Sequence, residues 1–419
     1  MAIRSLQIML LAGAVSVALL DGENTQAQTP ERQSYRLGEI IDEALQHNPA
    51  LRVAGSLVKQ GEGLQQTAAA YPNPTITGTM GPGKTREALG DLTFFERGVT
   101  LSQPLEWPGM RQARQHAAEA AVAGSQAALD GTRLNLIADI KVAFYQLLLA
   151  QRNVELTTQA LRNSQDFYRN IKGRVDAGQA RPFEALKADV EVQKVSNDLN
   201  HAKHALIIAQ ARLNALSGGI LRKGFGVHGD FEVPRQSLHL EKLVTIAIEQ
   251  HPTIRRVRKQ VEGAAHSVLQ ERRSVVPFVT VSGSYHQEAA ETAYLVRLSI
   301  PIPLWYRRQG EIATALSAKE RAEAEQVRTE NDLVVAITET VEEAHAAQDR
   351  IDVFEKGLLK QAEETLRIAR VSFQQGAVSL LEVIDAQRVH RQTLLEYTDA
   401  RANFSIALAR LERWTGELQ

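Results

Sequence analysis

One run of the sequence has the spacing of a phosphate-binding loop. Gly78, Gly83, Lys84 and Thr85 satisfy the pattern of glycine, four residues, then Gly-Lys-Thr. In nucleotide-binding proteins this loop follows a strand and opens a helix, so that backbone amides surround the phosphates. Here a second strand-like run, residues 94–103, follows instead of a helix. We therefore expect a flexible hairpin loop, and a P-loop nucleotide-binding protein is the weakest alternative.

Two histidines could bind a metal. His201 and His204 are three residues apart and would share one face of a helix. Metal sites in proteins need at least a third ligand nearby, and none accompanies this pair, which favours two solvated side chains. The sequence also lacks a nucleophile elbow, a His-Glu-x-x-His motif and a Gly-x-Gly-x-x-Gly motif. We predict no catalytic residue, no metal site and no cofactor, and hence a protein that is not an enzyme.

Acidic residues cluster after two helix breaks. Glu184 and Asp189 follow the first break, and Glu382 and Asp385 follow the second. Acids in the first turn of a helix offset its dipole, which accounts for Glu184. In a ring of identical subunits, inward-facing acids would also form a constriction that attracts cations. Both interpretations stay open for Glu382 and Asp385.

Composition excludes some classes of protein. The 419 residues include 48 basic and 49 acidic side chains, a formal charge of -1, which gives no basic surface for nucleic acid. The chain has no cysteine, so disulfides, thiolate metal sites and a lipid anchor on cysteine are excluded.

The N-terminus has the pattern of a signal peptide. Arg4 precedes an apolar run, residues 6–20, which is followed by Thr25-Gln26-Ala27. We predict a signal peptide of residues 1–27, because the run is shorter than the ~20 residues of a membrane-spanning helix. No later run is apolar for long enough either, so a mature chain that enters a membrane must do so as strands of a closed barrel.

The chain contains two tandem copies of one unit. The run from Ala44 to Pro49 recurs as Ala247 to Pro252, and Gly178 corresponds to Gly376, about 200 residues later in each case. The glycine-rich stretch 217–234 separates the copies. We predict a first repeat of residues 28–223 and a second repeat of residues 224–419.

Each copy contains a long helical hairpin. Bulky residues recur every seven positions, as in coiled coils, beside a row of small residues. A helix over residues 109–175 would be on the order of 100 Å long. Each long helix meets a break at Gly178 or Gly376, and a return helix follows. In copy one the bulky row is Ile140, Leu147, Val154, Leu161, Tyr168 and Val175, and the small row is Ala143, Ala150, Thr157 and Ser164; in copy two the bulky row is Ile337, Ala344, Ile351, Leu358, Leu366 and Phe373, with one extra residue before Leu366.

Two strand-like runs precede each hairpin. They are residues 74–80 and 94–103 in copy one, and 278–285 and 294–300 in copy two. Apolar and polar residues partly alternate in them, as in membrane barrels, although soluble hairpins would look similar. Closed barrels need about eight strands or more, so this interpretation requires two or three chains.

The layout resembles the TolC-like outer-membrane efflux family over residues 35–414. The resemblance is carried by the doubled Ala-x-x-x-(Asn/His)-Pro element, by Leu101 to Gly109 and by Arg174 to Gly178. It implies a mainly α fold with a small β part: a homotrimer that shares a twelve-stranded barrel and extends helical hairpins as a periplasmic tunnel. The runs Pro104 to Arg111 and Ile300 to Ile312 look most like the CzcC-like heavy-metal branch, although Met110 stands where that branch commonly has lysine.

The resemblance also implies a function and partners. It implies a passive export duct in the outer membrane, in contact with outer-membrane lipid. A periplasmic adaptor (membrane fusion) protein would dock at the tips around Arg174, Gly178 and Gly376, and an inner-membrane RND-type pump would supply the driving force. Glu382 and Asp385 would line the closed entrance. The alternative is a soluble periplasmic coiled-coil scaffold or adaptor, which should not show strand pairs at matching places in both copies.

Overall fold

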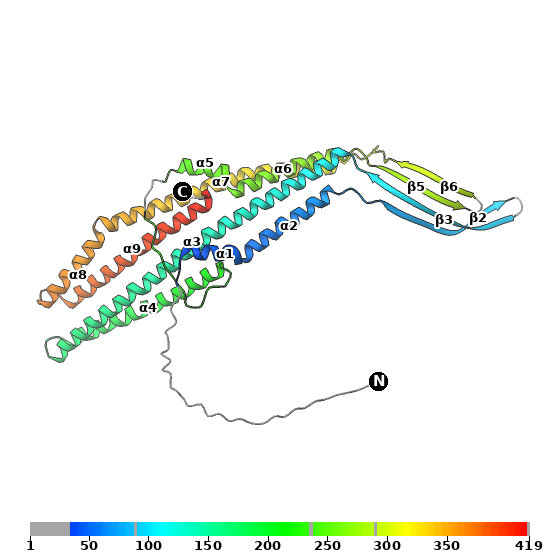
Figure 1. Ribbon diagram of the computed structural model, residues 1–419. Helices are drawn as coiled ribbons and strands as arrows, with labels where there is room; N and C mark the ends of the chain where they lie inside the picture. The colour runs from blue at the N-terminus through cyan, green and yellow to red at the C-terminus, as the bar shows by residue number, and fades with distance from the viewer. Residues whose placement is uncertain (1–33, 88–89, 234–237, 289–290, 417–419) are drawn as a thin grey trace, which may run out of the picture.

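The protein is an elongated molecule with strands at one end and two helical tips at the other (Figure 1). A computed structural model describes residues 34–87, 90–233, 238–288 and 291–416. The predicted signal peptide, residues 1–27, lies outside the described residues. Within those ranges, no helix is both long enough and apolar enough to cross a bilayer.

The four strands form one antiparallel sheet. They are β2 (Thr75–Glu87), β3 (Gly90–Leu105), β5 (Val279–Glu288) and β6 (Glu291–Ser299), in the order β2-β3-β5-β6. The central pair joins the two copies, with Leu101 opposite Gly283. The predicted strand pairs are therefore present, and each is longer than expected at its hairpin end.

The phosphate-loop pattern lies inside a strand. Gly78 pairs with Val99, and Lys84 pairs with Thr93, so β2 continues through the whole pattern. The strand-like run of residues 74–80 is confirmed through Met80, but the prediction of a flexible hairpin loop for the rest of the pattern is wrong. In an extended edge strand, alternate backbone amides bond to β3 and the others point the opposite way, so they cannot converge on one phosphate. The nucleotide-binding alternative therefore lacks the geometry that it requires.

Two pairs of short helices lie ahead of the strands, and the sequence interpretation missed them. They are α1 (Leu37–His47) and α2 (Pro49–Ala69) in copy one, and α5 (Leu240–Gln250) and α6 (Pro252–Arg273) in copy two. In each pair the repeated Asn/His-Pro motif ends one helix and begins the next. The Asn or His side chain accepts a hydrogen bond at the new N-terminus, and proline occupies the first helical position, where it needs no donor.

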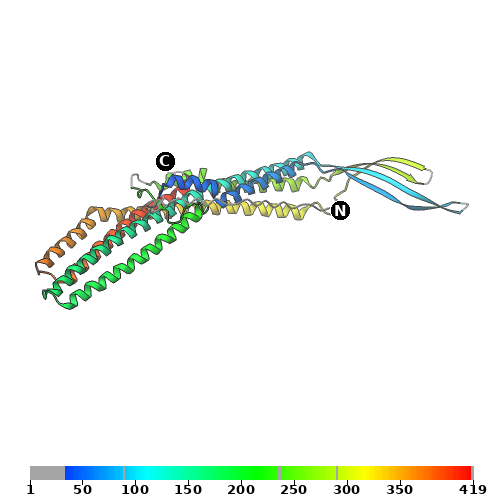
Figure 2. The same cartoon turned by 60° about the horizontal axis from the view of Figure 1, so that its bottom comes forward.

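The long hairpins form as predicted. In copy one, α3 (Pro108–Asp176) runs from the sheet to the tip and α4 (Pro182–Leu216) returns. In copy two, α7 (Gln309–Val353) leads into α8 (Leu359–Gln374), and α9 (Leu380–Thr415) returns. Both tips lie at the end remote from the strands, as Figure 2 also shows. A small parallel pair, β1 (Ser34–Tyr35) with β4 (Gly226–Val227), lies near the middle.

The extra residue of copy two lies at a kinked π-helical turn, in which Gly357 has a non-helical φ of 163°. Residues Phe354–Leu358 join α7 to α8, and the helix axis changes direction there (Figure 1). Eight residues, rather than seven, separate Leu358 from Leu366 at this point. One inserted residue in an α-helix is commonly accommodated as such a turn. The sequence located the insertion, but it did not predict the bend.

The main core lies midway along the molecule. Ile140 and Leu147 of α3 are fully buried there, together with Leu213 of α4 and Ile40 of α1. Nearer the tip the small row takes over: Thr157 and Ser164 are buried, whereas Val154 and Leu161 are only half-buried. In the main core both rows are buried, since Ala143 and Ala150 are also buried there, so only the bulky row becomes more exposed toward the tip.

Candidate functional site: the helical tips and the cleft between the hairpins

Each tip is closed by a glycine with a left-handed backbone. Gly178 has φ +71° and Gly376 has φ +73°. The amide of Gln179 donates to the carbonyl of Arg174 at 2.7 Å, and the amide of Ala377 donates to that of Ser372 at 2.9 Å. This is the Schellman ending of a helix, in which glycine avoids the steric cost of the left-handed conformation. The two tips therefore share one turn geometry.

The two tips pack against each other. Phe167 of α3 and Phe373 of α8 have ring centroids 5.9 Å apart. The Arg174 guanidinium lies 5.2 Å from the centroid of the same Phe373 ring, a cation–π geometry. The structure thus brings the predicted residues Arg174, Gly178 and Gly376 to one end of the molecule.

Apolar side chains remain exposed beside this end. Phe183 and Leu186, on the first turns of α4, are 60% and 67% exposed. Lys187 lies 4.8 Å above the Phe183 ring. A partly apolar, partly basic surface therefore flanks the first tip.

Glu184 and Glu382 lie in the first turns of the return helices, and Asp189 and Asp385 follow one to two turns later. Glu382 accepts a hydrogen bond from the Ser379 hydroxyl at 3.1 Å, which fits its place at the start of α9. Asp385 is exposed one turn later. Glu184 and Asp189 are half-buried on α4. The local role of Glu382 at the helix start is clear, and a role in a shared entrance depends on other subunits.

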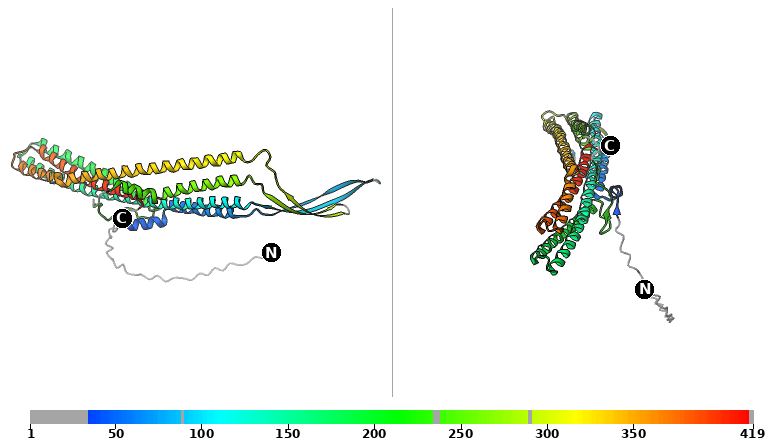
Figure 3. Two further views of the ribbon diagram at one scale, coloured as in Figure 1. Left: turned by 90° about the horizontal axis from the view of Figure 1, so that it is seen from above. Right: turned by 90° about the vertical axis from the view of Figure 1, so that its left-hand side faces the viewer.

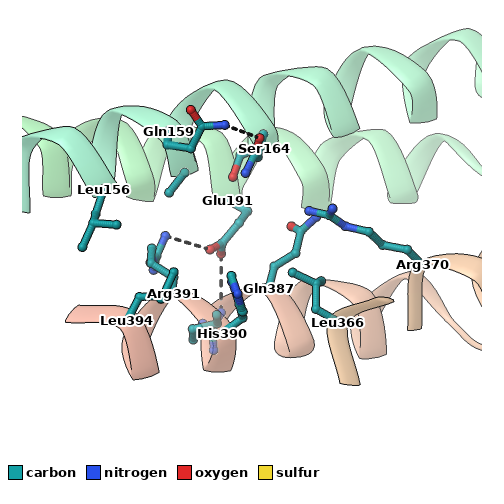
Figure 4. Close-up of a pocket in the computed structure, with 13 residues that line it drawn as sticks. Leu156, Gln159, Ser164, Glu191, Leu366, Arg370, Gln387, His390, Arg391 and Leu394 are labelled. Atoms are coloured by element: carbon teal, nitrogen blue, oxygen red, sulfur yellow. Dashed lines mark hydrogen bonds and ion pairs between the residues drawn. The ribbon is translucent and has the colours of Figure 1, made fainter. Parts of the chain in front are cut away.

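A polar cleft between the two hairpins was missed by the sequence interpretation (Figure 4). Its centre is Glu191 of α4, which is only 7% exposed. One Glu191 oxygen lies 3.5 Å from Arg388 and the other lies 3.8 Å from Arg391, both on α9. Arg391 also lies 3.5 Å from Asp198. Ion pairs therefore connect the return helix of copy one to that of copy two.

A small cavity adjoins these ion pairs. It has a volume of about 100 Å³ and is lined by residues of α3, α4, α8 and α9, including Ser164, Arg370 and His390. Burial lowers the pKa of His390; the nearby Glu363 carboxylate opposes this shift, and the Arg370 guanidinium adds to it. The sequence did carry one signal for this cleft, because Glu191 lies between the core positions Ala188 and Val195.

His201 and His204 do not form a metal site in the described part of the chain. Both are exposed on α4. Across the described ranges, no group of three or more His, Cys, Asp or Glu side chains converges in a way that could hold a metal ion.

Comparison with known proteins identifies the family. The model of the family described as outer membrane efflux protein matches residues 40–219 and 243–417. The chain belongs to the outer membrane efflux protein family. Membership places the protein in the outer membrane, with its helical part extending into the periplasm, which argues against a soluble scaffold.

Curated relatives include proteins named for metal resistance. The chain is 25% identical over 368 residues to the cobalt-zinc-cadmium resistance protein CzcC of Cupriavidus metallidurans, covering 87% of this chain and 86% of that protein. It is 21% identical over 389 residues to the cation efflux system protein CusC of Escherichia coli, covering 88% of this chain and 84% of that one.

Solved channels share the fold. The outer-membrane channel OprN has a TM-score of 0.80 at 17% identity, over 91% of this chain and 89% of that one. The open-state MtrE channel of Neisseria gonorrhoeae has a TM-score of 0.76 at 18% identity, over 91% of this chain and 89% of that one. The predicted TolC-like fold is confirmed.

Proposed function

We propose that this family member is the outer-membrane duct of a tripartite efflux system and acts as a homotrimer without enzymatic activity. The observation that carries the proposal is the open sheet. β2 and β6 are the outermost strands of a four-stranded sheet. Unpaired strand edges are satisfied when they pair with another chain. Three copies joined edge to edge, β6 to β2, would leave no free edge and would surround a passage.

The proposed cargo is heavy-metal cations. Similarity to proteins named for cobalt, zinc, cadmium and general cation efflux supports this substrate class. The duct performs no bond chemistry. An inner-membrane RND-type pump supplies the driving force, and a periplasmic adaptor links the pump to the tips around Arg174, Gly178 and Gly376.

The proposal includes removal of a signal peptide and division of the remaining chain into two repeats. Residues 1–27 are removed as a signal peptide, and residues 28–223 and 224–419 are the two repeats. Corresponding helices in the two copies support this division, since α1 to α4 are matched by α5 to α9 in the same order.

The proposed entrance is the ring of tips. Three copies of Glu382 and Asp385 would bring six carboxylates to one constriction, which favours cations. Opening is a population shift between closed and open arrangements of the hairpins, driven by an adaptor that binds the open arrangement more tightly. Separation of the hairpins must break the ion pairs of Glu191 and the contact between Phe167 and Phe373.

The test is membrane fractionation followed by native mass measurement in detergent. A detergent-stable trimer from the outer-membrane fraction is the expected result. A monomer that stays monomeric at high protein concentration would overturn the trimeric duct. Metal tolerance of cells with a matched pump and adaptor, with and without this chain, then tests the cargo.

A further inference from the structure

Aromatic and basic side chains are exposed at the junction between the sheet and the helices. Four connections cross this junction: residues 70–74, 106–107, 274–278 and 300–308. Figure 3 shows them at one level, between the helical body and the strands. We call these connections and the adjoining helix ends, residues 108–114, 270–273 and 309–311, the collar.

The collar exposes large side chains that a protein core would bury. Trp305 is 90% exposed, Tyr71 is 66% exposed, and Trp107 and Tyr306 are more than half exposed. Trp and Tyr are enriched where a membrane meets water, because one side of the ring is apolar and the other carries a polar group. Collar residues that point outward therefore fit a headgroup layer better than bulk water.

The collar is also basic, in a chain whose formal charge is only -1. It contains six arginines but only three acidic residues, Glu106, Glu271 and Glu311. Arg114 pairs with Glu106, and Arg308 pairs with Glu271. The collar's arginines are Arg111, Arg114, Arg272, Arg273, Arg307 and Arg308.

Two of these arginines present free positive charge. Arg272 and Arg307 are exposed, and among the described residues neither guanidinium has a carboxylate partner. Arg111 and Arg273 pair with neutral groups instead: Arg111 lies 4.0 Å from the centroid of the Tyr71 ring, and Arg273 donates to the Gly109 carbonyl at 2.6 Å. Arg272 and Arg307 can therefore take phosphate oxygens without losing an existing ion pair.

The collar adjoins strands that expose apolar side chains. Val296 of β6 is 87% exposed, and Met80 of β2 is 79% exposed. Because the family is located in the outer membrane, the strands lie in that membrane and the helices lie in the periplasm. The collar must then lie at the level of the headgroups of the periplasmic leaflet.

We propose that the collar is a binding surface for the headgroups of anionic phospholipids in the periplasmic leaflet. Trp305 and Tyr306 insert at the boundary of the acyl chains, and Arg272 and Arg307 bind headgroup phosphates. The surface selects anionic over zwitterionic lipid, because its uncompensated charge is positive. The proposal rests on the outer-membrane location alone and does not depend on the trimer, the cargo or the pump.

The first experiment locates Trp305 by fluorescence quenching. The full chain carrying Trp107→Phe and Trp414→Phe retains Trp305 as its one tryptophan, since the sequence has three. In nanodiscs of phosphatidylglycerol, lipids brominated near the headgroup should quench its emission and aqueous iodide should not. Strong iodide quenching with no effect of brominated lipid would overturn the proposal. If that variant folds poorly, the unmodified chain and Trp305→Phe can be compared instead. The fluorescence that brominated lipid quenches should then be lost in Trp305→Phe.

The second experiment measures lipid selectivity with matched variants. Native mass spectrometry of the full chain should show retained phosphatidylglycerol in preference to phosphatidylcholine. Arg272→Gln with Arg307→Gln should weaken retention by about fivefold for each arginine removed. The control pair, Arg162→Gln with Arg212→Gln, removes the same charge from exposed positions on α3 and α4, away from the collar, and should leave retention unchanged.

Three results would count against the collar. They are equal weakening by the control pair, equal retention of the two lipids, and displacement of the lipid by millimolar inorganic phosphate, which would indicate a free phosphate site. None of them would alter the outer-membrane fraction or the native mass that test the proposed duct. Failure of the collar is therefore distinguishable from failure of the duct.

Discussion

The connection between α1 and α2 in copy one is equivalent to the connection between α5 and α6 in copy two, but different residues stabilise them. In copy one, the Asn48 side chain accepts from the Ala50 amide at 2.8 Å and donates to the Leu216 carbonyl at 2.7 Å. In copy two, the Thr253 amide donates to Nδ1 of His251 at 3.2 Å, and Nε2 of His251 lies 3.1 Å from the Arg413 carbonyl. Both contacts of His251 exist together only in the neutral ring that carries its proton on Nε2.

We therefore expect low pH to destabilise the connection between α5 and α6 at His251. Burial lowers the pKa of His251, and the nearby Arg255 lowers it further, whereas the Arg413 carbonyl opposes the shift. Because the unfolded chain binds the proton more readily, stability is highest above the ordinary histidine pKa of about 6.5 and falls as the pH drops below it. The loss stops growing below the folded-state pKa.

His251→Asn should reduce this pH dependence, because it installs the residue of copy one. Thermal unfolding midpoints at pH 7.5 and pH 5.5 provide the measurement, and comparison of the two proteins cancels the other histidines. An equal drop in both proteins would contradict a special role for His251.

Glu191 should contribute more to stability than its neighbour Asp198. Glu191→Ala leaves Arg388 and Arg391 without their shared buried carboxylate, and we expect a loss of about 1–3 kcal/mol. Asp198→Ala is the matched control, because it removes a carboxylate from the same Arg391 at a half-exposed position; surface pairs contribute about 0–1 kcal/mol. Denaturant unfolding followed by circular dichroism compares the variants. Equal losses would show that burial of Glu191 has no special effect.

Sequence reasoning located the tip residues whose local conformation follows from local rules. Gly178 and Gly376 follow from helix endings, and Glu382 follows from the preference for acids at helix starts. Glu191 and His251 were missed as interacting residues because their partners, Arg391 and Arg413, lie far away in the chain. A single sequence shows no such pairing until the hairpins are placed side by side.

At the scale of the elements, the turn glycine and a helical glycine should respond in opposite ways. Gly178→Ala puts a side chain into a left-handed conformation and should cost about 1–2 kcal/mol. The control, Gly173→Ala, lies within α3 with open space around its Cβ and should stabilise by about 0.5–1 kcal/mol. Thermal unfolding measures both changes. Destabilisation by both would point to lost tip contacts rather than to backbone conformation.

The long elements were predictable because their signals extend over many residues. The expected helix of residues 109–175 differs by one residue at each end from α3. The short helices were missed because the Asn-Pro and His-Pro motifs were interpreted only as repeat markers. Gly83 was assigned to a hairpin loop because a second strand-like run follows it, yet β2 and β3 pair through this glycine, which usually weakens a strand.

At the scale of the whole molecule, the contacts between the hairpins limit how the tips can move. The two hairpins meet at the contact between the Phe167 and Phe373 rings and, further from the tips, at the ion pairs of Glu191. The π-helical turn of copy two gives that hairpin a bend that α3 lacks. The two hairpins of one subunit are therefore not equivalent, and their acids need not be equivalent either.

The entrance proposal predicts that the second pair of acids, and not the first, controls cation access. Six carboxylates about 10 Å from a divalent cation would stabilise it by about 1.4 kcal/mol after salt screening, which is about tenfold in affinity. Glu382→Ala with Asp385→Ala should therefore weaken cation block about tenfold and raise single-channel conductance in planar bilayers. The matched control is Glu184→Ala with Asp189→Ala, which removes the same charge from the half-buried positions of copy one and should leave block unchanged. Unchanged conductance and block in the Glu382 and Asp385 variant would mean that these acids only stabilise the start of α9, where Glu382 already accepts the Ser379 hydroxyl.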